Sequence, residues 1–436
     1  MSRYGTAILT AALLATSSYA AVLRVPKDHK TIQEAIGAAA EGDTILLAAG
    51  TYVVESHLEV QKRLTIASAF IDSKDGGDID RTIVKAGDKA IKQWFDLGRR
   101  AKGSKVVGLT ILGNRTHSLA ICNAYSEVSH CKFVGGTDQL SFEGGGGLVS
   151  HCQFEGAGDD AVDADNSVSW TVEHCTIKGA HDDGIEVRLH AKKGPITTHI
   201  ARYNTFTECT TGVQFIDYAG DSRRRFEIHG NVFKNTKSTA LDCTVHTSNR
   251  NTDGSPMVEE ATIFGNTIDG CLNGITMAPR LVILNNIITN TKEKGIVKGK
   301  HLEAGARSIV DHCLFFGNAL DYDEGVDLGK SIFTFDPQYV DATSRVVAGK
   351  PGHRQGGRHL HMARRRGAED PGRGLLREGP RTGCLRARQS RALTPRPLYS
   401  PPRPAAQVQA VRWWRRRARA VDCGLSHYLR QQHGSP

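Results

Sequence analysis

The feature that most constrains this chain is a short motif that recurs at irregular intervals. Cys131, Cys152 and Cys175 each follow a histidine and each precede Phe or Ile by two residues. Later copies of the motif carry Asn or Cys in the same slot, at Asn204, Asn231, Asn266, Asn286 and Cys313. The steps between neighbours range from 20 to 35 residues. Such variable steps do not suit a helical repeat of fixed length, but they are typical of a solenoid whose coils keep three short strands and take insertions in the turns.

A second motif, a turn followed by a short alternating strand, comes about ten residues after several copies of the first. Glycine at the turn, as at Gly184 and Gly212, permits the positive φ of a tight turn. The alternation predicts one inward column of Ile185, Val213, Leu241, Ile275, Ile296 and Val326, and one outward column of Glu186, Gln214, Asp242, Thr276 and Asp327. Inward Asn side chains can then hydrogen-bond the coils above and below. The cysteines of the first motif are expected to be reduced and buried in the same slot.

The start of the chain predicts a helix that covers the open first coil. Thr31 and Glu34 form a capping-box pattern, and an apolar face follows at helical spacing. Such a helix would hide the strand edges ahead of a first strand at Thr44–Leu47. The segment from Val25 to Ile36, with Gly42-Asp43-Thr44-Ile45 and Gly50-Thr51-Tyr52, resembles the opening of pectate-lyase-like proteins. This resemblance implies an all-β, right-handed parallel β-helix over roughly Val22 to Ala342. The superfamily includes pectin esterases, polygalacturonases, polysaccharide lyases, uronan epimerases and members without known activity.

The two ends of the chain are predicted to lie outside the solenoid, which we place at residues 21–345. Residues 1–20 have the pattern of a signal peptide, with Arg3, an apolar run and small residues before Ala20. We therefore expect a secreted protein, extracellular or periplasmic, with no membrane span. Residues 346–436 form an Arg-, Pro- and Gly-rich tail with 20 basic and 4 acidic residues, whereas the preceding residues have 36 and 42. The tail is predicted to be disordered, either as a polyanion-binding segment or as the product of a frameshift in a GC-rich gene.

The densest acidic cluster is predicted to bring two neighbouring coils together. Asp159, Asp160 and Asp163 are followed about 23 residues later by Asp182, Asp183 and Glu186. In register, Asp163 would stand beside Glu186, followed by Gln214 and Asp242. Carboxylates stacked about 4.8 Å apart repel one another unless they are protonated or bridged by a cation. We therefore assign Asp163, Glu186 and Asp242 as candidate Ca²⁺ ligands, since Ca²⁺ prefers several oxygen ligands.

The cluster suggests three functions. The leading one is a secreted, Ca²⁺-assisted lyase that cleaves an acidic, uronic-acid polysaccharide, with Arg188 as the candidate base. The second is an inverting glycoside hydrolase that uses Asp159, Asp160 and Asp182 or Asp183 as acid and base; Gly158-Asp159-Asp160 resembles the catalytic Gly-Asp-Asp of polygalacturonases. The third is a non-catalytic β-helix that binds glycan or builds a surface structure, in which the Asp pairs only shape turns. We expect a monomer, and no nucleic-acid binding by the folded domain, because the net charge of residues 1–345 is negative.

Overall fold

The computed structural model describes residues 20–339, except residues 92, 114–116, 165–168, 190–192, 218–222, 244–260, 300–301 and 303–307. The chain divides into two units, Met1–Val346 and Val347–Pro436. The predicted signal peptide and the predicted tail both lie outside the described residues, except for Ala20. Within the described part of the chain, no helix is long and apolar enough to cross a membrane.

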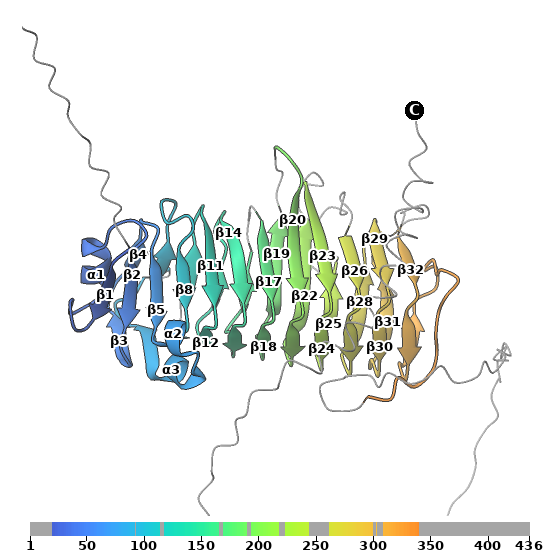
Figure 1. The fold of residues 1–436 in the computed structure, drawn as a ribbon. Coiled ribbons are helices and arrows are strands. Elements are labelled where there is room, and N and C mark those ends of the chain that lie inside the picture. Colours follow the sequence, from blue (N-terminus) through green and yellow to red (C-terminus); the bar gives the residue numbers. More distant parts are fainter. Residues whose placement is uncertain are drawn as a thin grey trace, which may run out of the picture. The chain divides into compact units, whose positions relative to one another are not determined.

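Short parallel strands stack into three long sheets, as Figure 1 shows. The first sheet has twelve strands: β1 (Val22–Val25), β2 (Thr44–Leu47), β5 (Thr65–Ser68), β8 (Lys105–Val107), β11 (Tyr125–Ser129), β14 (Gly146–Ser150), β17 (Trp170–Glu173), β20 (Thr197–Arg202), β23 (Arg224–His229), β26 (Ala261–Phe264), β29 (Leu281–Leu284) and β32 (Ile309–Asp311). The second has eleven: β3 (Gly50–Val54), β6 (Thr82–Ala86), β9 (Thr110–Leu112), β12 (Lys132–Val134), β15 (Gln153–Glu155), β18 (Thr176–Lys178), β21 (Thr205–Thr207), β24 (Val232–Lys234), β27 (Thr267–Asp269), β30 (Ile287–Thr289) and β33 (Leu314–Phe316).

The third sheet also has eleven strands: β4 (Leu58–Val60), β7 (Phe95–Leu97), β10 (Leu119–Ile121), β13 (Leu140–Ser141), β16 (Val162–Asp163), β19 (Asp183–Leu189), β22 (Thr211–Asp217), β25 (Thr239–Asp242), β28 (Asn273–Met277), β31 (Lys294–Lys298) and β34 (Leu320–Tyr322). Each coil contributes one strand to each sheet in turn. The predicted fold of stacked three-strand coils is therefore confirmed.

Inward side chains of the third sheet form the predicted apolar column. Ile185 pairs in register with Val213, and the column continues through Leu241, Ile275 and Ile296, all fully buried. Val326 is not its last member, because Tyr322 pairs with Ile296 and the strand ends there. The glycines at these turns also differ from the prediction. Gly184 does not have a positive φ; a Cβ atom there would lie 2.5 Å from the Gly212 carbonyl oxygen and 2.6 Å from the Phe206 ring, so close packing explains the glycine.

The N-terminal helix forms at the predicted position, but a strand precedes it. Helix α1 (Ile32–Ala38) begins after Thr31, whose hydroxyl accepts a hydrogen bond from the Glu34 amide at 3.1 Å. The Glu34 carboxylate accepts from the Lys30 amide, one residue before the N-cap. Strand β1 runs ahead of the helix and pairs with β2, so the first strand is Val22–Val25 rather than Thr44–Leu47. Two further short helices, α2 (Phe70–Ser73) and α3 (Gly76–Arg81), were not predicted.

The Cys and Asn residues of the first motif form one continuous buried column. The side chain of Asn266 donates hydrogen bonds to the Ile228 carbonyl at 2.9 Å and to Asn286 Oδ1 at 3.0 Å. Its own Oδ1 accepts from the amide and the side chain of Asn231, both at 3.0 Å. Asn204 repeats this pattern two coils earlier, and its Oδ1 accepts from the Cys175 amide. The cysteines of this column are free thiols, as predicted.

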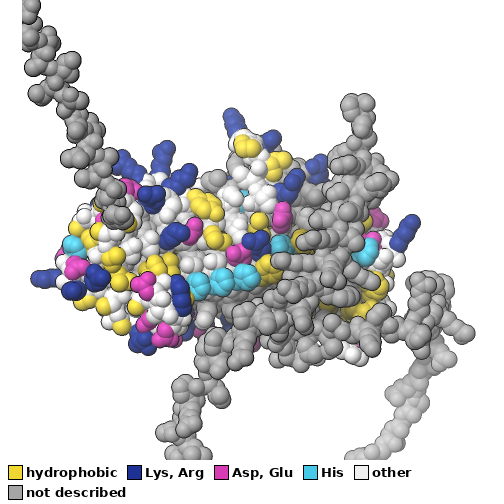
Figure 2. Space-filling model, viewed as in Figure 1, with side chains coloured by type: hydrophobic (Ala, Val, Ile, Leu, Met, Phe, Trp, Pro, Cys, Tyr) yellow, Lys and Arg dark blue, Asp and Glu magenta, His cyan; other side chains and the backbone are white. Residues whose placement is uncertain are grey.

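The histidines beside this column stack on one another at the outer surface. A row of histidine side chains is visible in Figure 2. His130, His151 and His174 sit in left-handed turns with φ of 54–55°, and neighbouring rings have centroids 4.8 and 5.0 Å apart. The stack continues through Tyr203, His229 and Phe264. These contacts support a structural role for the three histidines.

The stack predicts a loss of stability in acid. Burial, helped by the charge of Arg202, lowers the pKa of His229 to about 4. Because this is below the unfolded value of about 6.5, the unfolded state binds the extra proton. The contribution of neutral His229 to the stability of the folded state is therefore fully present above about pH 6.5 and is lost as the pH falls toward 4. When the pH falls from 7 to 4, the free energy of unfolding of the wild type should fall by up to about 3 kcal/mol more than that of His229→Phe, as measured by urea unfolding.

His312→Phe is the matched control for this measurement. His312 is an exposed histidine at the same corner of a later coil, in the left-handed position that Gly230 takes beside His229. An equal loss of stability in wild type and His229→Phe would show that His229 does not contribute to acid sensitivity.

Candidate acidic site

The outward face of the third sheet carries the predicted acidic column. Asp163 in β16 pairs in register with Glu186 in β19, which pairs with Gln214 in β22, and Gln214 pairs with Asp242 in β25. Three of these side chains are buried: Asp163 is 5% exposed, Glu186 4% and Asp242 3%. The predicted register of the column is therefore the observed one.

A second acidic column lies three residues earlier, at the corner that leads into the third sheet. The Asp160 amide donates to Asp138 Oδ1 at 3.4 Å, and the Asp183 amide donates to Asp160 Oδ1 at 2.9 Å. Asp160 and Asp183 are buried, whereas Asp182 is exposed and Asp159 is half-buried. The Asp182 amide donates to the Asp159 carbonyl, which places these two residues side by side as predicted.

The two columns meet at Asp160. One oxygen each of Asp160, Asp163 and Glu186 lies within 4.8 Å of the others. Asp160 is also in two further groups of this kind, one with Asp138 and Asp159 and one with Asp182 and Asp183. Oxygens this close can share a cation, since Ca²⁺ binds oxygen at about 2.3–2.6 Å. Within the described residues, Asp242 is in none of these groups; it lies two register steps from Glu186, or about 10 Å at the usual strand spacing.

Burial and mutual repulsion favour the protonated form of several carboxyl groups. The pKa of Asp160 rises to about 11, first through burial and then through the charges of Glu186 and Asp183. Burial, and then the charge of Asp182, also raise the pKa of Asp183 well above its usual range, although a contact with Thr211 acts in the opposite direction. Neither oxygen of Asp183 has a hydrogen bond of standard geometry. Burial and the charge of Asp138 raise the pKa of Asp159. Without a cation, the cluster therefore holds protons at neutral pH.

Arg188 stands at the rim of the cluster on the same strand as Glu186. Its guanidinium Nη2 lies 2.7 Å from Glu186 Oε2, in an ion pair without the geometry of a directed hydrogen bond. The Arg188 side chain is 39% exposed, whereas that of Glu186 is 5% exposed. Asp165, which the register of Asp163 with Glu186 would place beside Arg188, lies outside the described residues.

Three polar residues next to the cluster, His117, Asp138 and Glu143, were not predicted as site residues. His117 Nε2 lies 2.8 Å from Asp138 Oδ2, and its Nδ1 lies 3.7 Å from Glu143 Oε1. The contact with His117 lowers the pKa of Glu143. A signal for Asp138 is present in the sequence: Gly136 and Asp138 have the same spacing as Gly158 and Asp160, one coil later.

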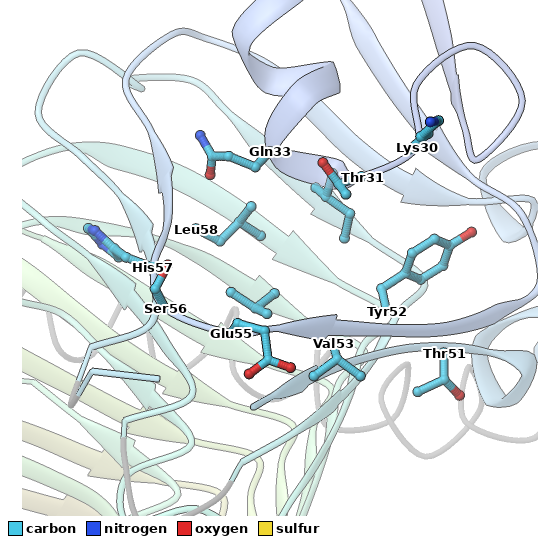
Figure 3. Close-up of a pocket in the computed structure, with 12 residues that line it drawn as sticks. Lys30, Thr31, Gln33, Thr51, Tyr52, Val53, Glu55, Ser56, His57 and Leu58 are labelled. Atoms are coloured by element: carbon cyan, nitrogen blue, oxygen red, sulfur yellow. The ribbon is translucent and has the colours of Figure 1, made fainter. Parts of the chain in front are cut away.

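A separate pocket of about 390 Å³ lies at the N-terminal end of the solenoid, shown in Figure 3. Thr31 and Gln33 from the start of α1 and Tyr52 and His57 from the first coil contribute to its lining. It contains none of the predicted site residues, so we place the candidate site on the acidic columns.

This chain is similar to one family model and to several solved structures. A family model described as a right handed beta helix region matches residues 99–255. A search of curated proteins finds no match. Similar solved structures include the catalytic unit of a thermostable GH87 alpha-1,3-glucanase from Streptomyces thermodiastaticus, at 12% identity and a TM-score of 0.48, covering 70% of this chain and 66% of that one.

Two others act on different polymers by their descriptions. One is a family 28 exopolygalacturonase from Yersinia enterocolitica, at 12% identity and a TM-score of 0.43, covering 76% of this chain and 80% of that one. The other is the A-module of a mannuronan C-5 epimerase from Azotobacter vinelandii, at 14% identity and a TM-score of 0.38, covering 70% and 95%. The stacked parallel sheets and the family match identify the described part of this chain as a right-handed parallel β-helix.

Proposed function

We propose that this protein is a secreted enzyme that cleaves an acidic polysaccharide along the third sheet, with Ca²⁺ and by β-elimination. The observation that carries the proposal is the group of Asp160, Asp163 and Glu186, three buried carboxylates with one oxygen each within 4.8 Å of the others. Three such groups cannot all be ionised without a compensating cation. Their oxygen-only chemistry and spacing fit Ca²⁺. Asp160 thus takes the place of Asp242 as the third ligand, and Asp242 lies further along the same face.

The roles of the residues follow from their positions. A bound Ca²⁺ would hold the carboxylate of a uronic-acid unit and acidify the carbon-bound proton beside it. We assign removal of that proton to Arg188, which is accessible at the rim. A guanidinium cannot accept a proton, so Arg188 must first release one to solvent. Its ion pair with Glu186 opposes that loss, and engagement of Glu186 by a nearby Ca²⁺ would favour it. Activity should therefore depend on Ca²⁺ both for substrate binding and for release of the base.

A second candidate reaction, hydrolysis, is supported by the raised pKa of Asp159. A half-buried carboxyl group that keeps its proton is suited to protonate a glycosidic oxygen. Asp182, its exposed neighbour, would then activate water on the other side of the bond.

One assay separates these functions. The full chain is incubated with polygalacturonate or alginate, with Ca²⁺ or with a chelator, and reducing ends and near-ultraviolet absorbance are both followed. Elimination predicts both signals, dependent on Ca²⁺ and lost in Arg188→Gln. The matched control is Arg202→Gln, which removes another ion-paired arginine, 2.5 Å from Glu173 on the first sheet. Reducing ends without absorbance would indicate hydrolysis, and binding with neither signal would contradict an enzymatic function.

A further inference from the structure

His117 contacts Asp138, which begins the corner column, and Glu143, two residues after the Ser141 that pairs in register with Asp163. It lies in the same register column as Asp138, since Leu119 pairs with Leu140 two residues later in each coil. His117 is 5% exposed and Asp138 6%, so their 2.8 Å contact is shielded from water. A charge-assisted contact in such surroundings is stronger than one at the surface. His117 therefore fixes the side chain of Asp138.

The first path from His117 leads to Asp160. Asp138 binds His117 through Oδ2 and accepts the Asp160 amide through Oδ1, at 2.8 and 3.4 Å respectively. Asp138 thus connects the imidazole of His117 to the backbone of Asp160, which belongs to all three carboxylate groups. A change in the orientation of Asp138 would move Asp160.

The second path leads to Asp163 through Glu143 and Ser141. Glu143 Oε1 accepts hydrogen bonds from Gln93 at 2.8 Å and from the Ser141 hydroxyl at 2.9 Å, and lies 3.7 Å from His117. Ser141 Oγ is also 3.5 Å from Asp163 Oδ2. The hydroxyl has one hydrogen, and the shorter contact to Glu143 takes it. Glu143, which His117 contacts, thereby fixes the position of Ser141 beside Asp163.

We infer that His117 is a positioning residue that sets Asp160 and Asp163 for cation binding through Asp138 on one side and through Glu143 and Ser141 on the other. The inference deepens the proposed function and rests on it for the identity of the cation. The imidazole itself does not touch the cation or the substrate. It orients two of the three carboxylates of the group, as residues that hydrogen-bond to metal ligands do in metal sites.

Calorimetric titration of the full chain with CaCl₂ tests this role. His117→Phe is expected to weaken Ca²⁺ affinity at least about tenfold, since loss of such a supporting residue typically costs about 10–100-fold. Glu143→Gln, which cuts the second path alone, should have a smaller effect. His57→Phe is the matched control: His57 lies 2.9 Å from Asp96 on the same sheet, and Asp96 is three register steps from Asp163. It should change the affinity less than twofold. Equal losses in His117→Phe and His57→Phe, or none in either, would overturn the inference.

A second readout does not need the cation. In amide NMR spectra without Ca²⁺, His117→Phe should shift the Asp160 and Asp163 resonances, whereas His57→Phe should not. His117→Gln, which keeps one donor for Asp138, should restore the Asp160 resonance. Unchanged resonances in His117→Phe would overturn the positioning role even if Ca²⁺ binds. Shifted resonances in a protein that binds no Ca²⁺ would instead support the positioning role and contradict the proposed function.

Discussion

Replacing Asp163 by Asn and Glu186 by Gln together is expected to abolish Ca²⁺ binding at the acidic face and to lower polysaccharide cleavage by about 10³-fold or more. Removal of even one preorganised charge-stabilising group costs roughly 10²–10³ in rate. The double change removes two of the three carboxylates of the group with Asp160 and leaves shapes nearly unchanged. Calorimetry with CaCl₂ and an assay of reducing ends measure the two effects.

The stability of this double variant distinguishes a functional site from a structural one. Without a cation, these buried carboxyl groups must take up protons or repel one another, so their replacement by neutral amides should leave the melting temperature in chelator unchanged or raise it. A matched control is the pair Glu127→Gln and Glu173→Gln, which removes two charges from the ion pairs of the first sheet. If the variant with Asp163→Asn and Glu186→Gln keeps its Ca²⁺ affinity and has a lower melting temperature, these two residues have a structural role only.

The fold was predictable because the repeat itself encodes the register. The slot of Cys131 and Asn231 recurs once per coil, and strand alternation then decides which side chains face inward. For the same reason the pairing of Asp163 with Glu186 followed from sequence alone. The last coil was not predictable in this way: Val326 follows a Gly turn like the earlier members, yet Tyr322 pairs with Ile296.

The site was only partly predictable, because side-chain contacts depend on more than register. Asp160 was assigned to catalysis rather than to the cation, since nothing in the sequence shows that a corner residue approaches the mid-strand column. His117 was not predicted as a site residue because no acidic residue lies near it in the sequence of its own coil. Its contacts with Asp138 and Glu143 depend on how two successive coils pack on one another.

The largest effect on stability is expected from Asn266→Ala. The Asn266 side chain takes part in four hydrogen bonds, with the Ile228 carbonyl, with Asn286 and twice with Asn231. Alanine would remove all four bonds. Asn286 Oδ1 would keep the Asn266 amide and the Asn231 side chain would keep the Ala201 carbonyl, but the Asn231 amide would lose its partner. Each buried group that finds no replacement costs about 1–3 kcal/mol. Allowing for local relaxation, we expect the free energy of unfolding to fall by about 3–5 kcal/mol, measured by urea unfolding. Asn273→Ala, which removes bonds to Glu293 and Lys294 from a partly exposed residue, should cost about 1 kcal/mol or less.

Asn266→Cys tests why the column contains both residue types. The Cys152 thiol reaches the Val128 carbonyl at 3.7 Å, in the position where Asn266 reaches the Ile228 carbonyl at 2.9 Å. A thiol is a weak donor and cannot link two coils as an amide does, since the amide both donates and accepts. Cysteine at position 266 should therefore fill the slot without a cavity but lose the links to Asn231 and Asn286, giving a stability between those of the wild type and Asn266→Ala. If Asn266→Cys were as unstable as Asn266→Ala, burial of a small side chain would contribute little to the stability of this column. If Asn266→Ala were as stable as the wild type, the hydrogen bonds of the Asn266 side chain would not hold the coils together.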